Sequence, residues 1–139
     1  MAFDAVELQL EHTAEGRFRH LARSAPFAIL VVDEESQCTF ANERWTAVTG
    51  RSVAQSVGDG WRDAFSPDVL EDLGRRWAAA AGNSLCMEAE FELGRPDGTR
   101  AWVHGSATRV QRPDGSPDGV LIALIDVTDR REAVDELRR

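Results

Sequence analysis

The chain has 139 residues, of which 42% are hydrophobic and 29% are charged, and this balance is typical of one soluble globular domain. Its formal net charge of −8 opposes a phosphate backbone, and no basic stripe interrupts it, so nucleic acid is not an expected partner. The longest apolar run, residues 27–32, is far shorter than the roughly 20 residues of a membrane-spanning helix. With no secretory signal visible, we expect a cytoplasmic protein without membrane insertion.

The two cysteines, Cys38 and Cys86, have neither the CxxC spacing nor the nearby histidines of a zinc site. No metal site is therefore expected, and a reducing cytosol suits two isolated thiols. All the basic residues are arginine and tyrosine is absent, a composition that indicates a GC-rich bacterial genome.

The N-terminal segment, residues 1–25, is predicted to form a flanking helix. Val6 and Leu10 stand four residues apart, as apolar residues on one helix face do. Pro26 should end this helix, because the residue before a proline avoids the α region.

A hairpin and a short helix are expected next. Residues 27–32 are apolar and rich in β-branched side chains, and residues 37–41 follow after an acidic turn, so the two runs predict paired strands. Asn42 is suited to cap the start of a helix, and Gly50 is suited to end it.

The middle of the chain is predicted to be helical. Residues 51–67 have weak periodicity, which indicates short helical turns and loops. Residues 68–81 carry an apolar stripe at helical spacing and are followed by Gly82, which predicts a longer helix. The stripe comprises Val69, Leu70, Leu73, Trp77 and Ala80.

The rest of the chain reads as antiparallel β-structure. Residues 85–93, 99–111 and 119–127 are three strand-like runs. Two copies of Arg-Pro-Asp-Gly, at 95–98 and 112–115, separate them. Proline presets a turn, aspartate bonds nearby backbone and glycine takes the left-handed position, so both copies predict hairpin turns.

The chain is expected to end in a helix that leaves directly from the last strand. Thr128 is suited to cap it, with acidic residues near its start and arginines at its end. The complete order predicts an α+β fold, in which a five-stranded antiparallel sheet has short helices packed on one face. We assign residues 26–127 to the core and residues 128–139 to the start of the exit helix.

Four groups of residues, in this order, resemble the PAS family over most of the chain. They are FAILVVD with FANERW (residues 27–33 and 40–45), GDGW with FSPD (58–61 and 65–68), FEL with RPDG and RAWV (91–103), and DVTDRR (126–131). The last is similar to the PAC-type motif through which family members leave for a signalling helix. In the second group, Ser66 and Val69 replace a His and an Asp that members often carry.

The resemblance implies a sheet that cups a cavity against helices, where a small molecule, a cofactor or nothing is held. It implies a bacterial signal-transduction domain that binds a ligand, dimerises, or does both. Homodimers would form through the N-terminal helix or the sheet face, and the exit helix would lead to an output domain. Asp126, Thr128 and Arg130 are the candidate relay residues. Two alternatives stay open, namely a haem or flavin sensor and the regulatory part of a histidine kinase, diguanylate cyclase or phosphatase.

The candidate pocket residues come from the second strand and the helices. Cys38, Phe40 and Asn42 share one face by the two-residue period of a strand, and that face is expected to point into the cup. The helical side would contribute Trp45, Val48, Trp61, Phe65, Leu73 and Trp77. Aromatic stripes at helical spacing usually pack against one another, so a filled core without a guest is the competing interpretation.

Cofactors and catalysis find little support, and we expect neither. The helix at 68–81 has no histidine, although haem-binding relatives often ligate iron from there, and His104 is expected to be a surface or sheet-face residue. No cysteine lies between positions 51 and 85, where light-oxygen-voltage relatives carry the one that forms a flavin adduct. Met87 is expected to fill core space. No phosphate loop, HExxH, GxSxG or activated nucleophile is present, so no residue is assigned as catalytic.

Overall fold

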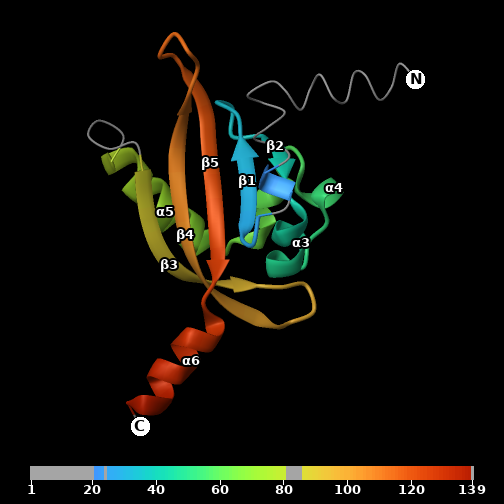
Figure 1. Cartoon of the computed structure of the whole chain (residues 1–139), viewed down its shortest axis with the longest axis vertical. Coiled ribbons are helices and arrows are strands. Elements are labelled where there is room, and N and C mark those ends of the chain that lie inside the picture. Colours follow the sequence, from blue (N-terminus) through green and yellow to red (C-terminus); the bar gives the residue numbers. More distant parts are fainter. Residues whose placement is uncertain (1–20, 24, 81–85, 139) are drawn as a thin grey trace.

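The computed structural model describes residues 21–23, 25–80 and 86–138, and it shows a curved antiparallel sheet with helices on one side (Figure 1). The helices and strands in chain order are β1 (Ala28–Val32), β2 (Cys38–Ala41), α3 (Glu43–Thr49), α4 (Val53–Ser56), the 3-10 helix η1 (Gly60–Ala64), α5 (Pro67–Ala80), β3 (Cys86–Gly94), β4 (Arg100–Gln111), β5 (Pro117–Asp126) and α6 (Thr128–Leu137). The five strands lie in the order β2-β1-β5-β4-β3. The α+β prediction, including its five strands, is confirmed.

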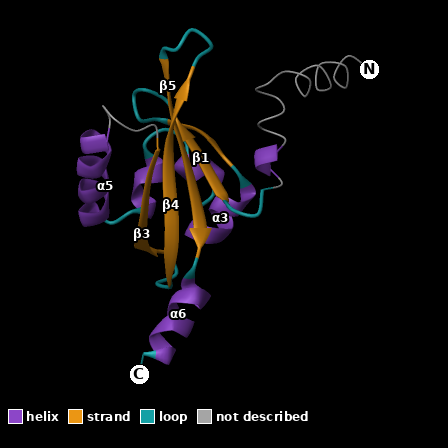
Figure 2. Ribbon diagram, turned by 60° about the vertical axis from the view of Figure 1, so that its left-hand side comes forward, coloured by secondary structure: helices purple, strands orange, loops and turns teal. Residues whose placement is uncertain are grey.

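Helices α3 and α5 lie against the inner face of the sheet and α4 packs beside β2, whereas α6 extends away from the sheet below β5 (Figure 2). Alternation along β4 places Ala101, Val103 and Gly105 in the interior, while Trp102 and His104 lie on the outer face. Ala101 and Val103 belong to an apolar cluster that also contains residues of β1 and β5. Burial of this face against the helices stabilises the fold.

Asn42 begins α3 as predicted, and it does more than cap the helix. Its Oδ1 accepts hydrogen bonds from the backbone N–H of Trp45 and of Ile29, both at 3.0 Å. Its Nδ2 donates to the carbonyls of Ala22 at 2.7 Å and Phe27 at 3.0 Å. The side chain is 2% exposed, so one buried amide connects β1, α3 and the segment that precedes the sheet.

Both Arg-Pro-Asp-Gly turns form as predicted. Gly98 has φ 88° and Gly115 has φ 86°, a region that side chains disfavour. The Oδ1 atoms of Asp97 and Asp114 each accept the N–H two residues later at 2.9 Å. The hydroxyls of Thr99 and Ser116 donate to the same oxygens at 2.6 Å, and these bonds, followed by the N–H bonds, lower the pKa of both carboxyls below their ordinary values.

The exit helix starts one residue earlier than expected, and Thr128 is not its cap. Val127 occupies the cap position without a side-chain bond to the helix. The Thr128 hydroxyl instead accepts the N–H of Trp102 at 3.0 Å and donates to Asp126 Oδ1 at 2.6 Å. The capping prediction is wrong because this hydroxyl joins α6 to β4.

Most of the predicted flanking helix, residues 1–25, lies outside the described residues. Residues 21–23 are helical, and Ala22 is buried. No helix in the described part of the chain has the length and hydrophobicity that crossing a bilayer requires.

Candidate functional site

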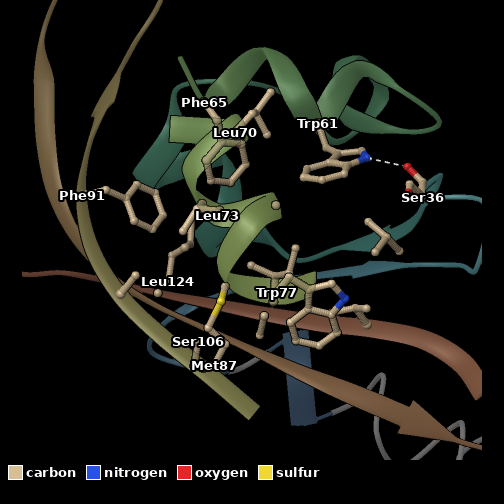
Figure 3. A pocket seen from close by; sticks show the side chains of 17 residues that line it. Ser36, Trp61, Phe65, Leu70, Leu73, Trp77, Met87, Phe91, Ser106 and Leu124 are labelled. Atoms are coloured by element: carbon tan, nitrogen blue, oxygen red, sulfur yellow. Dashed lines mark hydrogen bonds between the residues drawn. The ribbon is translucent and has the colours of Figure 1, made fainter. Parts of the chain in front are cut away.

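A cavity of about 240 Å³ lies between the inner face of the sheet and the helical layer (Figure 3). Its sheet wall is built from inward positions of β3, β4 and β5. They include Met87, Ala89, Phe91, Gly105, Ala107, Val120, Ile122 and Leu124. This wall is apolar, and its alanines and glycine leave the room that larger side chains would fill.

Gly105 is required by this wall. A Cβ placed there would lie 2.9 Å from Cε1 of Phe91 and 3.2 Å from Cδ2 of Leu124. A side chain at this position would therefore have to displace the Phe91 ring, which lies across the neighbouring strand. The ring in turn meets Phe65 of the helical layer, with 5.6 Å between the two ring centroids.

The helical wall consists mainly of aromatic and aliphatic side chains. Phe65 follows η1, and its ring centroid is 5.8 Å from that of Trp61 in an edge-on arrangement, which aromatic pairs favour. From α5, Leu70, Leu73, Gly74 and Trp77 complete the wall. The indole N–H of Trp61 donates to the carbonyl of Ser36 at 2.9 Å, so its polar atom is satisfied by the protein itself (Figure 3).

Four of the nine predicted pocket residues line this cavity, namely Trp61, Phe65, Leu73 and Trp77. The other five are Cys38, Phe40, Asn42, Trp45 and Val48, and none of them lines it. Trp45 and Val48 are buried core residues. The indole N–H of Trp45 donates to Ser56 Oγ at 2.8 Å, which ties α3 to α4.

The prediction that Cys38 and Phe40 share a face is wrong. The pairing of β1 with β2 shifts by one residue, so Cys38 stands opposite Val32 while Phe40 stands opposite Val31. Such a bulge reverses the alternation along one strand. Cys38 is consequently buried, and this burial raises the pKa of its thiol.

Sequence reasoning missed most of the sheet wall. Met87, expected to fill core space, lines the cavity instead. The two-residue period marks its neighbours Ala89 and Phe91 as members of the same face, which is the signal that could have found them. His104 lies on the outer face, where its ring nitrogens are 3.7 Å from Glu88 and 3.6 Å from Glu90. It is the sheet-face histidine that was expected.

The junction with α6 forms a second feature of interest. Arg130 Nη2 donates to Glu90 Oε1 at 2.8 Å, and Arg131 holds its guanidinium 4.0 Å from the centroid of the Trp102 ring. The Arg130 contact, the largest cause, lowers the pKa of Glu90 below its usual value. These contacts fix the first turn of α6 to the outer face of β3 and β4.

The predicted relay residues Asp126 and Thr128 meet at this junction. Asp126 Oδ1 accepts both the N–H and the hydroxyl of Thr128, at 2.9 and 2.6 Å. Its Oδ2 lies 3.5 Å from Nη2 of Arg95, whose Nε donates to the carbonyl of Val48 at 2.9 Å. Arg95 thus links the end of α3 to the start of α6.

Comparison with known proteins gives a family and a fold. The family model described as the PAS fold matches residues 22–132, which contain the expected core of residues 26–127. The uncharacterized protein y4lL of Sinorhizobium fredii is 31% identical over 123 residues. That match covers 88% of this chain and 15% of the relative, so the chain spans a small part of the relative's length.

Several solved structures share the fold. A PAS domain from Colwellia psychrerythraea superposes with a TM-score of 0.73 at 18% identity, covering 81% of this chain and 96% of that one. An RNA-binding light-oxygen-voltage receptor gives a TM-score of 0.75 at 22% identity, covering 88% of this chain and 36% of the receptor chain. The PAS domain of a LuxR-family regulator from Burkholderia thailandensis, in complex with ethanol, gives a TM-score of 0.66 at 16% identity. That match covers 79% of this chain and 96% of the regulator's PAS domain chain.

Proposed function

The chain belongs to the PAS family of sensory modules, and from that premise we propose that it binds a small apolar ligand in its cavity and relays binding to α6. The observation that carries the proposal is that β4 and β5 both line the cavity and contact the start of α6. Gly105 and Leu124 line the cavity, while Trp102 and Asp126 on the same strands hold the start of α6. A shift in either strand therefore reaches the helix within two or three residues.

The mechanism follows from the two walls of the cavity. A ligand that contacts the sheet wall and α5 together stabilises the packing in which both walls fit it. Because Thr128 bonds to β4 and follows β5 after a single residue, no slack loop separates the sheet from α6. A change in the strands would alter the direction of the helix, in the manner of other packed junctions that have two arrangements.

Toluene is a suitable probe of this proposal, because it is apolar and small. We expect amide resonances in ¹H–¹⁵N spectra of the full chain to shift both at the cavity and in residues 128–137. Ala107→Leu, whose added atoms point into the cavity, should abolish both sets of shifts, whereas Ala123→Leu on the outer face should not. Shifts confined to the cavity would refute the relay, and no shifts at all would refute binding.

The proposal extends to assembly and context. We propose a cytoplasmic homodimer formed through the N-terminal segment or the outer sheet face, because Leu21 is 68% exposed and Ile125 of β5 is 50% exposed. We also propose that an output domain accompanies this one, because the match covers only 15% of a longer relative, and that α6 leads toward that domain. Sedimentation of the chain and of Ile125→Glu tests the sheet-face dimer: a dimer that Ile125→Glu leaves intact would contradict it.

No resident cofactor is part of this proposal. The aromatic side chains of the cavity lie close to one another. Its volume of about 240 Å³ is also below the range of about 300–1,000 Å³ that is typical of pockets for larger ligands such as cofactors. An absorbance spectrum of the protein as isolated tests this point. A band beyond the tryptophan region would contradict it.

A further inference from the structure

Arg109 is a cationic side chain on the inner, mostly apolar face of the sheet. It pairs with Val120 of β5, two positions beyond Ala107 on β4. Its guanidinium carbon lies 5.0 Å from the centroid of the Trp77 ring, which is stacking distance for a cation over an aromatic face. Its Nε is buried and has no hydrogen-bond partner in the described part of the chain.

That unpartnered donor belongs to a side chain next to the cavity. Arg109 lines a second hollow of about 360 Å³ that adjoins the first. Val32, Ser36, Trp77 and Val120 line both spaces, so the two meet along the Trp77 ring. A molecule in the apolar cavity that extends past Trp77 therefore reaches the guanidinium of Arg109.

The charges around Arg109 leave it available. Asp33 and Glu34 also line the second hollow, but within the described residues neither forms an ion pair with Arg109. Oδ1 of Asp33 accepts the N–H groups of Glu35 and Gln37, both at 2.9 Å, and so takes part in its own turn. A buried charged donor without a partner is unfavourable, and an oxygen supplied by a ligand would satisfy it.

Resting on the proposed function, we propose that the ligand is a small monocarboxylic acid with an apolar body. The body occupies the apolar cavity, and the carboxylate accepts hydrogen bonds from Arg109, whose planar fork matches a carboxylate. A cavity of about 240 Å³ suits a ligand on the order of ten non-hydrogen atoms. The apolar walls select against a second charge, because burying an unpaired charge is costly.

Phenylacetate and phenylacetamide are matched probes, since they have the same size and shape and differ in charge. Titration of the full chain, followed in ¹H–¹⁵N spectra, should show phenylacetate binding at least about tenfold more tightly. The Arg109 Nε–H resonance, which burial shields from exchange, should shift with phenylacetate and much less with phenylacetamide. This resonance reports on the unaltered protein and does not depend on any variant folding.

Arg109→Met should remove the preference for the acid and leave phenylacetamide binding unchanged, while Arg109→Lys should keep part of the preference. The control is Arg62→Met, because Arg62 lies 5.6 Å from the centroid of Trp61, the other tryptophan of the cavity, and does not line it. This variant should retain the full preference.

Three results would overturn the inference and leave the proposed function standing. They are equal binding of acid and amide, a preference that survives Arg109→Met, and failure of both probes in a protein that binds toluene. Failure of toluene as well would count against the proposed function itself.

Discussion

Arg130 of α6 donates a hydrogen bond from Nη2 to Oε1 of Glu90 on β3 at 2.8 Å, across 40 positions of the sequence. Glu90 also lies 3.7 Å from Nη1 of Arg131 and 3.6 Å from Nδ1 of His104. None of the described residues of α6 is buried. Polar contacts of this kind, rather than apolar burial, therefore hold the exit helix to the sheet.

Glu90→Gln should release the first turn of α6. The neutral amide keeps the size of the side chain and loses the charge that holds Arg130 and Arg131. We expect faster hydrogen exchange of amides in residues 130–137, with little change in the core. Glu88→Gln is the matched control, because Glu88 is also next to His104 on the outer face and has no contact with either arginine in the described residues. Equal exchange in the two variants would contradict the anchoring role.

The same carboxyl predicts a pH dependence. The pKa of Glu90 is lowered in the folded protein. The contribution of its charge to stability and to the attachment of α6 is therefore complete above about pH 4.3, the ordinary pKa of a glutamate. This contribution is lost as the pH falls through the lower pKa of the folded state. Helical chemical shifts of α6 in the unaltered chain should decline over that interval. Because Asp97 and Asp114 also have a lowered pKa, the Glu90→Gln variant provides the baseline, and it should show no such decline in α6.

Asn42→Ala should lower the free energy of unfolding by more than the loss of an ordinary helix cap does. Loss of a cap destabilises by about 1 kcal/mol, and here the N–H of Ile29 and the carbonyl of Ala22 lose buried partners as well. We expect a loss of about 2–4 kcal/mol in urea unfolding. Asn42→Asp keeps the oxygen that caps α3 but turns its other oxygen toward the carbonyls of Ala22 and Phe27, so it should also destabilise, through loss of both donated bonds and through repulsion. A loss below about 1 kcal/mol for Asn42→Ala would mean that water replaces these bonds.

Two glycines that line the cavity should respond in opposite ways to alanine. Gly74 lies inside α5, and a Cβ there would meet nothing within 4 Å, so Gly74→Ala should stabilise by about 0.5–1 kcal/mol. Gly105→Ala would press against Phe91 and should destabilise by about 1–3 kcal/mol. Thermal or urea unfolding of both variants measures the pair. Equal effects would show that the Phe91 ring moves freely.

Replacement of Trp45 and of Trp77 by alanine should destabilise the protein to different extents. Trp45 is 0% exposed and bonded to Ser56, so Trp45→Ala should cost about 3–5 kcal/mol. Trp77 is only partly buried and lies beside the cavity, so Trp77→Ala should cost clearly less. Unfolding in urea compares the two. A larger loss at Trp77 would mean that the cavity wall, rather than α3, holds the core together.

The sequence by itself determined the local structure of this protein. The two Arg-Pro-Asp-Gly turns, the start of α3 at Asn42 and its end at Gly50 were all predictable. Each depends on backbone geometry and on hydrogen bonds between residues a few positions apart, so the chemistry that decides it is contained in a short segment. The PAS-like α+β fold followed from the order of these segments.

Only the tertiary structure decided which side chains meet. A one-residue shift in the pairing of β1 and β2 places Phe40 and Cys38 on opposite faces of the sheet. No local sequence pattern predicts such a bulge. The partner of Thr128 proved to be β4 rather than its own helix. Arg109 beside Trp77 depends on how the sheet and α5 pack, because side chains distant in sequence are brought together only by burial of the whole inner face.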